Sequence, residues 1–127
     1  MSASIYELIG GEAGVKSLVT RFYDLMETAP AGAAARAIHP ADMSESRIKL
    51  FEYLSGWLGG PPLFTEKRGA PMLRARHLPF KVGPDEARSW LWCFETALNE
   101  TVADAQVRAA IWPHIEKLGL HMRNQEG

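Results

Sequence analysis

Apolar residues recur at three- and four-residue steps along most of this chain, which is the spacing that places them on one face of an α-helix. The clearest stretches span about residues 12–27, 44–58 and 84–99, and a further one spans about 103–123. That last stretch contains Pro113, which we expect to kink or split the helix. No stretch alternates apolar and polar residues with the period of a β-strand. The pattern predicts an all-α fold of roughly five to six helices, arranged as a bundle or a globin-like sandwich.

Composition narrows the class of protein. With 127 residues, 46% of them hydrophobic, the chain is expected to form one domain, residues 1–127, with a core and room for one enclosed ligand. Its 14 basic and 15 acidic residues nearly cancel, which predicts no nucleic-acid partner and no attraction to a membrane surface. The single cysteine, Cys93, excludes an intramolecular disulfide and multi-cysteine metal sites. No leader opens the chain and no apolar run reaches the ~20 residues of a membrane span, so we expect a soluble, cytoplasmic protein.

One histidine lies in a setting that suits a haem ligand, within the stretch Arg74-Ala-Arg-His77-Leu-Pro-Phe80. Pro79 favours the end of a helix near His77, whose backbone could accept the N–H that an iron-bound imidazole leaves over. Phe80 would supply an apolar wall, and Arg76 a cationic partner for a haem carboxylate. The stretch therefore predicts half of a haem site, although a lone histidine beside hydrophobic residues is more often structural.

Two other segments carry weaker signals. Residues 59–71 interleave proline, glycine and charged residues, which predicts an irregular loop of the kind that often serves a site. His114 and His121 are separated by ~10.5 Å of helix, so they cannot share one metal ion and are expected at the surface.

Five landmarks together resemble a group II truncated haemoglobin over nearly the whole chain. The landmarks are Gly10-Gly11, Arg21-Phe22-Tyr23, Leu58-Gly59-Gly60-Pro61-Pro62, the stretch that holds His77, and Trp90-Leu-Trp-Cys93. Their order and spacing are specific, whereas each one alone is weak. The resemblance implies a truncated globin-like, two-over-two helical sandwich with haem b between the helices. It also implies that His77 is the proximal iron ligand.

The resemblance assigns three further residues to the ligand side of the haem. Tyr23 matches the tyrosine whose hydroxyl can donate to bound O₂, and Trp90 matches the buried tryptophan typical of this group, whose indole N–H is only a donor. His39 departs from the family pattern, which often has phenylalanine or tyrosine there, and it adds a group whose charge can change near neutral pH. We expect His39 to join a distal hydrogen-bond network or to hold a water.

The helix after residue 44 is expected to supply the pocket's edge. Ser46 and Leu50 are one turn apart, so both can face the ligand cavity, and the small Ser46 matches a gate position that it should leave open. Lys49 lies at the edge of the buried face, where its ammonium could reach a haem propionate. The predicted cofactor contacts are Lys49, Arg76, Phe80 and Phe94.

These residues predict a haem-binding globin that reversibly binds O₂, NO or CO. Several distal donors should slow O₂ release, which favours ligand chemistry, such as conversion of NO to nitrate with an external reductase. A peroxidase-like haem protein is the alternative within haem chemistry. The alternative that involves no haem is a helical interaction module. In that case His77 is structural, Tyr23 bonds a backbone carbonyl, and His39 is a solvent-facing turn residue. A homodimer is possible, with Trp92 as an association surface.

Overall fold

Helices form all the regular structure in residues 4–69 and 82–121, the ranges that this computed structural model describes. The prediction of an all-α fold is therefore confirmed. No helix in these ranges is both long and apolar enough to cross a membrane. The elements are α1 (Ile5–Leu8), α2 (Gly11–Thr28), the short 3₁₀ turn η1 (Pro30–Gly32), α3 (Ala33–Ala37), α4 (Ser44–Trp57), α5 (Leu63–Arg68), α7 (Pro84–Thr101) and α8 (Ala105–His121).

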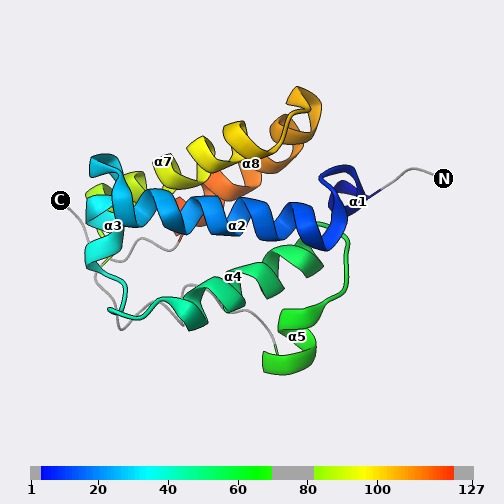
Figure 1. The fold of residues 1–127 in the computed structure, drawn as a ribbon, viewed down its shortest axis with the longest axis horizontal. Coiled ribbons are helices and arrows are strands. Elements are labelled where there is room, and N and C mark those ends of the chain that lie inside the picture. Colours follow the sequence, from blue (N-terminus) through cyan, green and yellow to red (C-terminus); the bar gives the residue numbers. More distant parts are fainter. Residues whose placement is uncertain (1–3, 70–81, 122–127) are drawn as a thin grey trace.

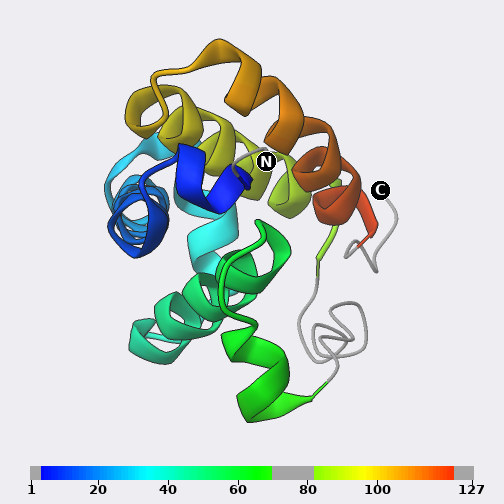
Figure 2. The same cartoon turned by 90° about the vertical axis from the view of Figure 1, so that its right-hand side faces the viewer.

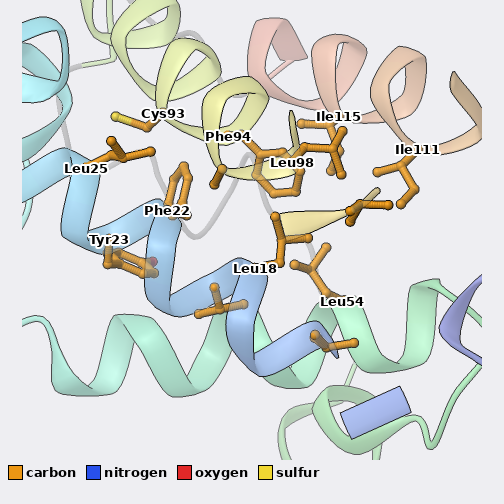
Figure 3. Close-up of a cluster of buried hydrophobic side chains, with 14 of the residues drawn as sticks. Leu18, Phe22, Tyr23, Leu25, Leu54, Cys93, Phe94, Leu98, Ile111 and Ile115 are labelled. Atoms are coloured by element: carbon orange, nitrogen blue, oxygen red, sulfur yellow. The ribbon is translucent and has the colours of Figure 1, made fainter. Parts of the chain in front are cut away.

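The long helix α2 is the centre of the arrangement, because it packs against both α4 and α7. Figures 1 and 2 show α4 and α5 on one side of α2, and α7 with α8 on the other. The predicted apolar stripe is buried as expected, with Phe22 at 0% exposure. Figure 3 shows Leu18 and Phe22 of α2 facing Phe94 and Leu98 of α7. Burying one large apolar side chain of this kind contributes about 1.5–3 kcal/mol, so this seam holds the two layers together.

The helix α7 begins where the sequence predicted a start. Pro84 occupies its first turn, and Asp85 and Glu86 place negative charge at the positive end of the helix dipole. On its inner side the Ser89 hydroxyl donates to the Ala31 carbonyl at 2.7 Å and accepts the Ala35 N–H at 3.0 Å. A buried serine of α7 therefore fixes the turn that follows α2.

The segment expected to be an irregular loop contains the helix α5, which is a correction to the sequence analysis. The helix α5 forms because an ion-pair cluster ties it to α4. The almost fully buried Glu52 carboxylate of α4 bonds Lys67 at 2.9 Å and Arg68 at 3.0 Å. Phe64 is also buried, against Tyr53 of α4. These tertiary contacts stabilise a helix too short to form alone.

Pro113 does not split α8, which is continuous from Ala105 to His121. The proline ring removes the N–H that would have bonded the Ala109 carbonyl. Both Ala109 and Pro113 lie on the exposed side of the helix, where water can bond that carbonyl instead.

Candidate functional site

Most residues that the sequence assigned to the site lie in the described ranges, on α2, α4, α7 and the turn after α3. They are Tyr23, His39, Ser46, Lys49, Leu50, Trp90 and Phe94. The predicted iron ligand His77, together with Arg76 and Phe80, lies outside the described residues. The structure therefore describes the residues predicted for the ligand side of the haem, together with the predicted cofactor contacts Lys49 and Phe94.

An aromatic cluster centred on Phe22 joins the two predicted distal donors. The Phe22 ring meets Tyr23 edge-on at 4.9 Å and Trp90 edge-on at 5.3 Å, measured between ring centroids. Trp90 stacks on Phe94 at 5.6 Å. Such aromatic pairs add about 0.5–1.5 kcal/mol beyond their burial. The cluster thus fixes Tyr23 and Trp90, which come from different layers, against one rigid ring.

Tyr23 is almost fully buried, at 4% exposure, and its hydroxyl donates to the backbone carbonyl of Ser46 at 3.2 Å. Burial raises the pKa of this phenol well above its ordinary value, and the nearby Arg47 opposes that shift only in part. Tyr23 is therefore a neutral hydrogen-bond donor throughout the physiological pH range. Ser46 contributes to this contact through its main-chain carbonyl, not through its hydroxyl.

His39 is half-buried, and one of its ring nitrogens has a defined role. Its Nδ1 lies 2.7 Å from the Ala35 carbonyl. A carbonyl can only accept, so Nδ1 carries a proton, and in the neutral imidazole Nε2 is then an acceptor. The ring meets Tyr23 edge-on at 6.1 Å. Arg36 braces the same turn by donating to the carbonyls of Pro40 and Ala41, each at 3.1 Å.

On α4, the Leu50 side chain is held by core packing, whereas the Lys49 side chain is held by an exposed ion pair. Leu50 packs against the core and is partly buried. The Lys49 ammonium pairs with Glu45 one turn earlier, at 3.3 Å, and its side chain is 44% exposed. Exposed pairs of this kind contribute little, so the ammonium can exchange to another anion at small cost. Its contact with a haem propionate stays a prediction.

Sequence reasoning missed Arg47, which lies beside the site. Its guanidinium carbon sits 5.3 Å from the centroid of the Tyr23 ring. The same group is 3.5 Å from carboxylate oxygens of Asp24 and Glu27 on α2. Asp24 and Glu27 are one helical turn apart, which is a signal for a charged face of α2, but nothing in the sequence indicates which α4 residue meets that face.

Sequence reasoning was also wrong about His114, which it placed at the surface. Its imidazole stacks on Trp57 of α4 with ring centroids 4.1 Å apart and planes at 13°. Its Nε2 is buried and has no hydrogen-bond partner among the residues that the structure describes. Burial and the nearby Lys117 lower the pKa of His114. The prediction failed because a stacking partner on another helix leaves no trace in helical periodicity.

The described helices also leave apolar surface that a cofactor could cover. Leu50, Tyr53 and Trp57 on α4, and Trp90 on α7, pack against the core but are only partly buried. Flat aromatic and aliphatic walls with few polar groups suit a planar macrocycle. Phe94 differs, because its ring is 0% exposed and already covered by protein, so its predicted cofactor contact stays untested. As a set, the residues fit a haem pocket.

Comparisons with known proteins agree with this arrangement. A sequence model of the bacterial-like globins matches residues 4–124. A group 2 truncated haemoglobin of Bacillus subtilis (strain 168) is 38% identical over 120 residues, covering 94% of this chain and 88% of that protein. A solved group II 2-on-2 haemoglobin from Agrobacterium tumefaciens is 49% identical, with a TM-score of 0.96 over 99% of this chain and 97% of that one. A cold-adapted truncated haemoglobin from Pseudoalteromonas haloplanktis TAC125 is 40% identical, with a TM-score of 0.93 over 97% and 99%. The predicted two-over-two sandwich is confirmed.

Proposed function

The chain belongs to the bacterial-like globin family, and we propose that it uses the haem of that family for chemistry on small diatomic ligands rather than for bulk oxygen delivery. Its cofactor is haem b, and it binds O₂. One observation supports the further step: the Tyr23 and Trp90 rings both contact Phe22. The His39 ring contacts Tyr23, so three side chains with polar hydrogens belong to one connected cluster. Donors beside a bound ligand slow its release, and slow release suits reaction better than delivery.

The haem supplies the redox chemistry when it is bound, and the resemblance assigns its iron to His77. Arg76 and Lys49 are the proposed partners of its carboxylates, and the Lys49 ammonium can leave Glu45 for that purpose because the pair is exposed. Leu50 and Ser46 would line the ligand cavity. Phe80 and Phe94 are the remaining proposed contacts.

The chain's own residues would act mainly by hydrogen bonding. Tyr23 stays protonated, so its hydroxyl can donate to a ligand once it turns away from the Ser46 carbonyl. Trp90 can only donate, and His39 can donate through Nε2 only when it is protonated. Each net hydrogen bond contributes about 0.5–1.5 kcal/mol, which corresponds to roughly two- to tenfold in a release rate. Two such donors would together lengthen O₂ residence by roughly four- to one-hundredfold.

We propose conversion of NO and O₂ to nitrate as the reaction. Nitrate formation from one NO and one O₂ consumes one electron, so a separate one-electron reductase would have to supply it. Cytoplasmic location and a homodimer through Trp92, which is 38% exposed, are further proposals.

A second candidate, peroxidase-like oxidation, is favoured by the tautomer of His39. Because Nδ1–H is bonded to the Ala35 carbonyl, Nε2 is the nitrogen of the neutral ring that can accept a proton, and the ring contacts that of Tyr23. Peroxide cleavage needs such a proton acceptor. Substitution of His39 by Phe should then abolish peroxide-driven oxidation while leaving NO consumption largely intact.

Absorption spectra of the ferric, reduced and CO-bound protein test the proposal, with His77→Gly measured with and without imidazole. Haem spectra should collapse in His77→Gly and recover with imidazole, while His121→Gly serves as the matched control. Rapid mixing of the oxygenated protein with NO should then yield one nitrate per haem. Failure of the wild type to take up haem would contradict the cofactor assignment, and NO consumption no faster than O₂ release would contradict the reaction.

A further inference from the structure

Two consecutive residues of α4 act on the same side chain of α2. The Ser46 carbonyl accepts the Tyr23 hydroxyl at 3.2 Å, and the Arg47 guanidinium lies over the Tyr23 ring at 5.3 Å. Figure 3 shows Tyr23 on the side of α2 that faces α4. The first turn of α4 therefore holds both the polar end and the face of this aromatic ring.

The Arg47 guanidinium is itself held in place from α2. Its Nη2 is 3.5 Å from Asp24 Oδ1 and 3.5 Å from Glu27 Oε1, which are side chains on the same helix as Tyr23. The Arg47 side chain is 30% exposed, and both carboxylates are more exposed still. Ion pairs this long and this exposed are weak and reversible. The arrangement is thus a contact that can open without unfolding a helix.

We propose that Arg47 is a positioning residue that holds the Tyr23 hydroxyl on the Ser46 carbonyl and so withholds it from a ligand in the haem pocket. This inference rests on the proposed function, since it requires Tyr23 to face that pocket. To bring its hydroxyl to a ligand, the Tyr23 ring must leave both the carbonyl and the guanidinium. The two contacts break together, so removal of either one increases the fraction of Tyr23 that can donate to the ligand.

The effect of the Arg47 contact on the position of Tyr23 can be predicted in magnitude. A guanidinium over an aromatic face at a partly exposed site shifts an equilibrium by about two- to fivefold. Arg47→Met keeps the length of the side chain and removes the charge and the planar group. It should slow O₂ release by about that factor. It should also lower the C–O stretching frequency of the CO complex, which reports hydrogen-bond donation to the ligand without any turnover.

The experiment compares Arg47→Met, Arg47→Lys and the control Arg88→Met in the haem-loaded protein. Lysine keeps the charge over the ring but not the planar group, so it should recover part of the wild-type frequency and rate. Arg88 pairs with Asp85 on an exposed side of α7, so its substitution should change neither. If Arg47→Met leaves both the frequency and the O₂ release rate at wild-type values, the inference is overturned.

Tyr23→Phe separates positioning from mere packing, because it keeps the ring and removes the hydroxyl. In that background Arg47→Met should have no effect on the C–O frequency, whereas an unchanged effect would show that Arg47 acts through something other than Tyr23. These variants distinguish a failure of the proposed function from a failure of the inference about Arg47. If Tyr23→Phe alone changes nothing, the ligand-facing role of Tyr23 fails and the inference fails with it. If Tyr23→Phe has an effect and Arg47→Met has none, only the inference fails.

Discussion

Ser89 and Ala35 are joined by a buried hydrogen bond of 3.0 Å, from the Ala35 N–H to the Ser89 hydroxyl. The carbonyl of the same Ala35 accepts the Nδ1 proton of His39 at 2.7 Å. A residue of α7 therefore orients His39 through one peptide residue, although the two side chains do not bond each other. Ser89 therefore helps to fix the position of His39 without lying next to it.

Ser89→Ala should lower the free energy of unfolding by about 1–3 kcal/mol, because it leaves the Ala35 N–H and the Ala31 carbonyl without their partner. Urea unfolding measures the loss, and nitrogen NMR of the His39 ring should show a less uniform tautomer. Thr101→Val is the control, since the Thr101 hydroxyl donates within α7, to the Ala97 carbonyl. A loss no larger than that of Thr101→Val would contradict the bridging role.

Glu52→Gln should destabilise the protein by about 1–3 kcal/mol at neutral pH, since Lys67 and Arg68 lose the buried carboxylate that they share. The bond from Lys67, together with Arg68, holds the pKa of Glu52 below the ordinary value of 4.5. A carboxyl with a depressed folded-state pKa stabilises above its unfolded-state pKa. The difference between wild type and variant should therefore persist above about pH 4.5 and shrink as the pH falls through the lower folded-state value.

Urea unfolding of both proteins between pH 3 and pH 7 checks that prediction. Glu66→Gln is the matched control, because Glu66 lies on α5 beside Lys67 and Arg68 but is exposed. A pH-independent difference between wild type and Glu52→Gln would show that the carboxylate charge is not what stabilises α5.

His114→Phe should make stability less dependent on pH, because phenylalanine keeps the stack on Trp57 and removes the titrating ring. The folded-state pKa of His114 is lowered from 6.5, so the unfolded chain binds the proton more readily. The free energy of unfolding of the wild type should then show no loss from His114 above about pH 6.5. It should fall as the pH drops below that value, by at most about 1.4 kcal/mol per pH unit. Thermal unfolding at pH 7.5 and pH 5.5 measures this. Equal pH slopes in the two proteins would contradict the burial of His114.

Tyr23→Phe should cost about 0.5–1.5 kcal/mol of stability in the haem-free protein, where the bond to the Ser46 carbonyl is lost. In the haem-loaded protein it should speed O₂ release by up to about tenfold. Stopped-flow exchange of O₂ for CO gives the rate. Loss of stability without any change in rate would assign Tyr23 to packing alone.

Most of the helical framework could be predicted from the sequence, because an apolar stripe such as that of α2 is a local signal. The start of α7 at Pro84 was equally local. The helix α5 was missed because its stability comes from Glu52, which lies on a different helix. The continuity of α8 through Pro113 depends on which side of the helix faces water, and that was not evident from the residue alone.

For the candidate site, the resemblance to a family supplied what periodicity could not. Tyr23, His39 and Trp90 are distant in sequence, and the structure joins them, with Tyr23 and Trp90 both against Phe22 and His39 against Tyr23. Their supports were not predictable, since Arg47 reaches the site across a helix interface and Ser89 acts through a main-chain group. Contacts of these two kinds depend on tertiary placement and have no fixed sequence spacing.

The docking of α5 by charges rather than by a broad apolar face has a consequence for solutions of high ionic strength. Dissolved ions screen the Lys67 to Glu52 attraction, because Lys67 is 65% exposed, whereas strongly hydrated salts favour burial of the apolar seam between α2 and α7. Salt therefore acts on this molecule in two opposite directions. A concentrated sulfate solution would raise its melting temperature while allowing one short helix to detach more often.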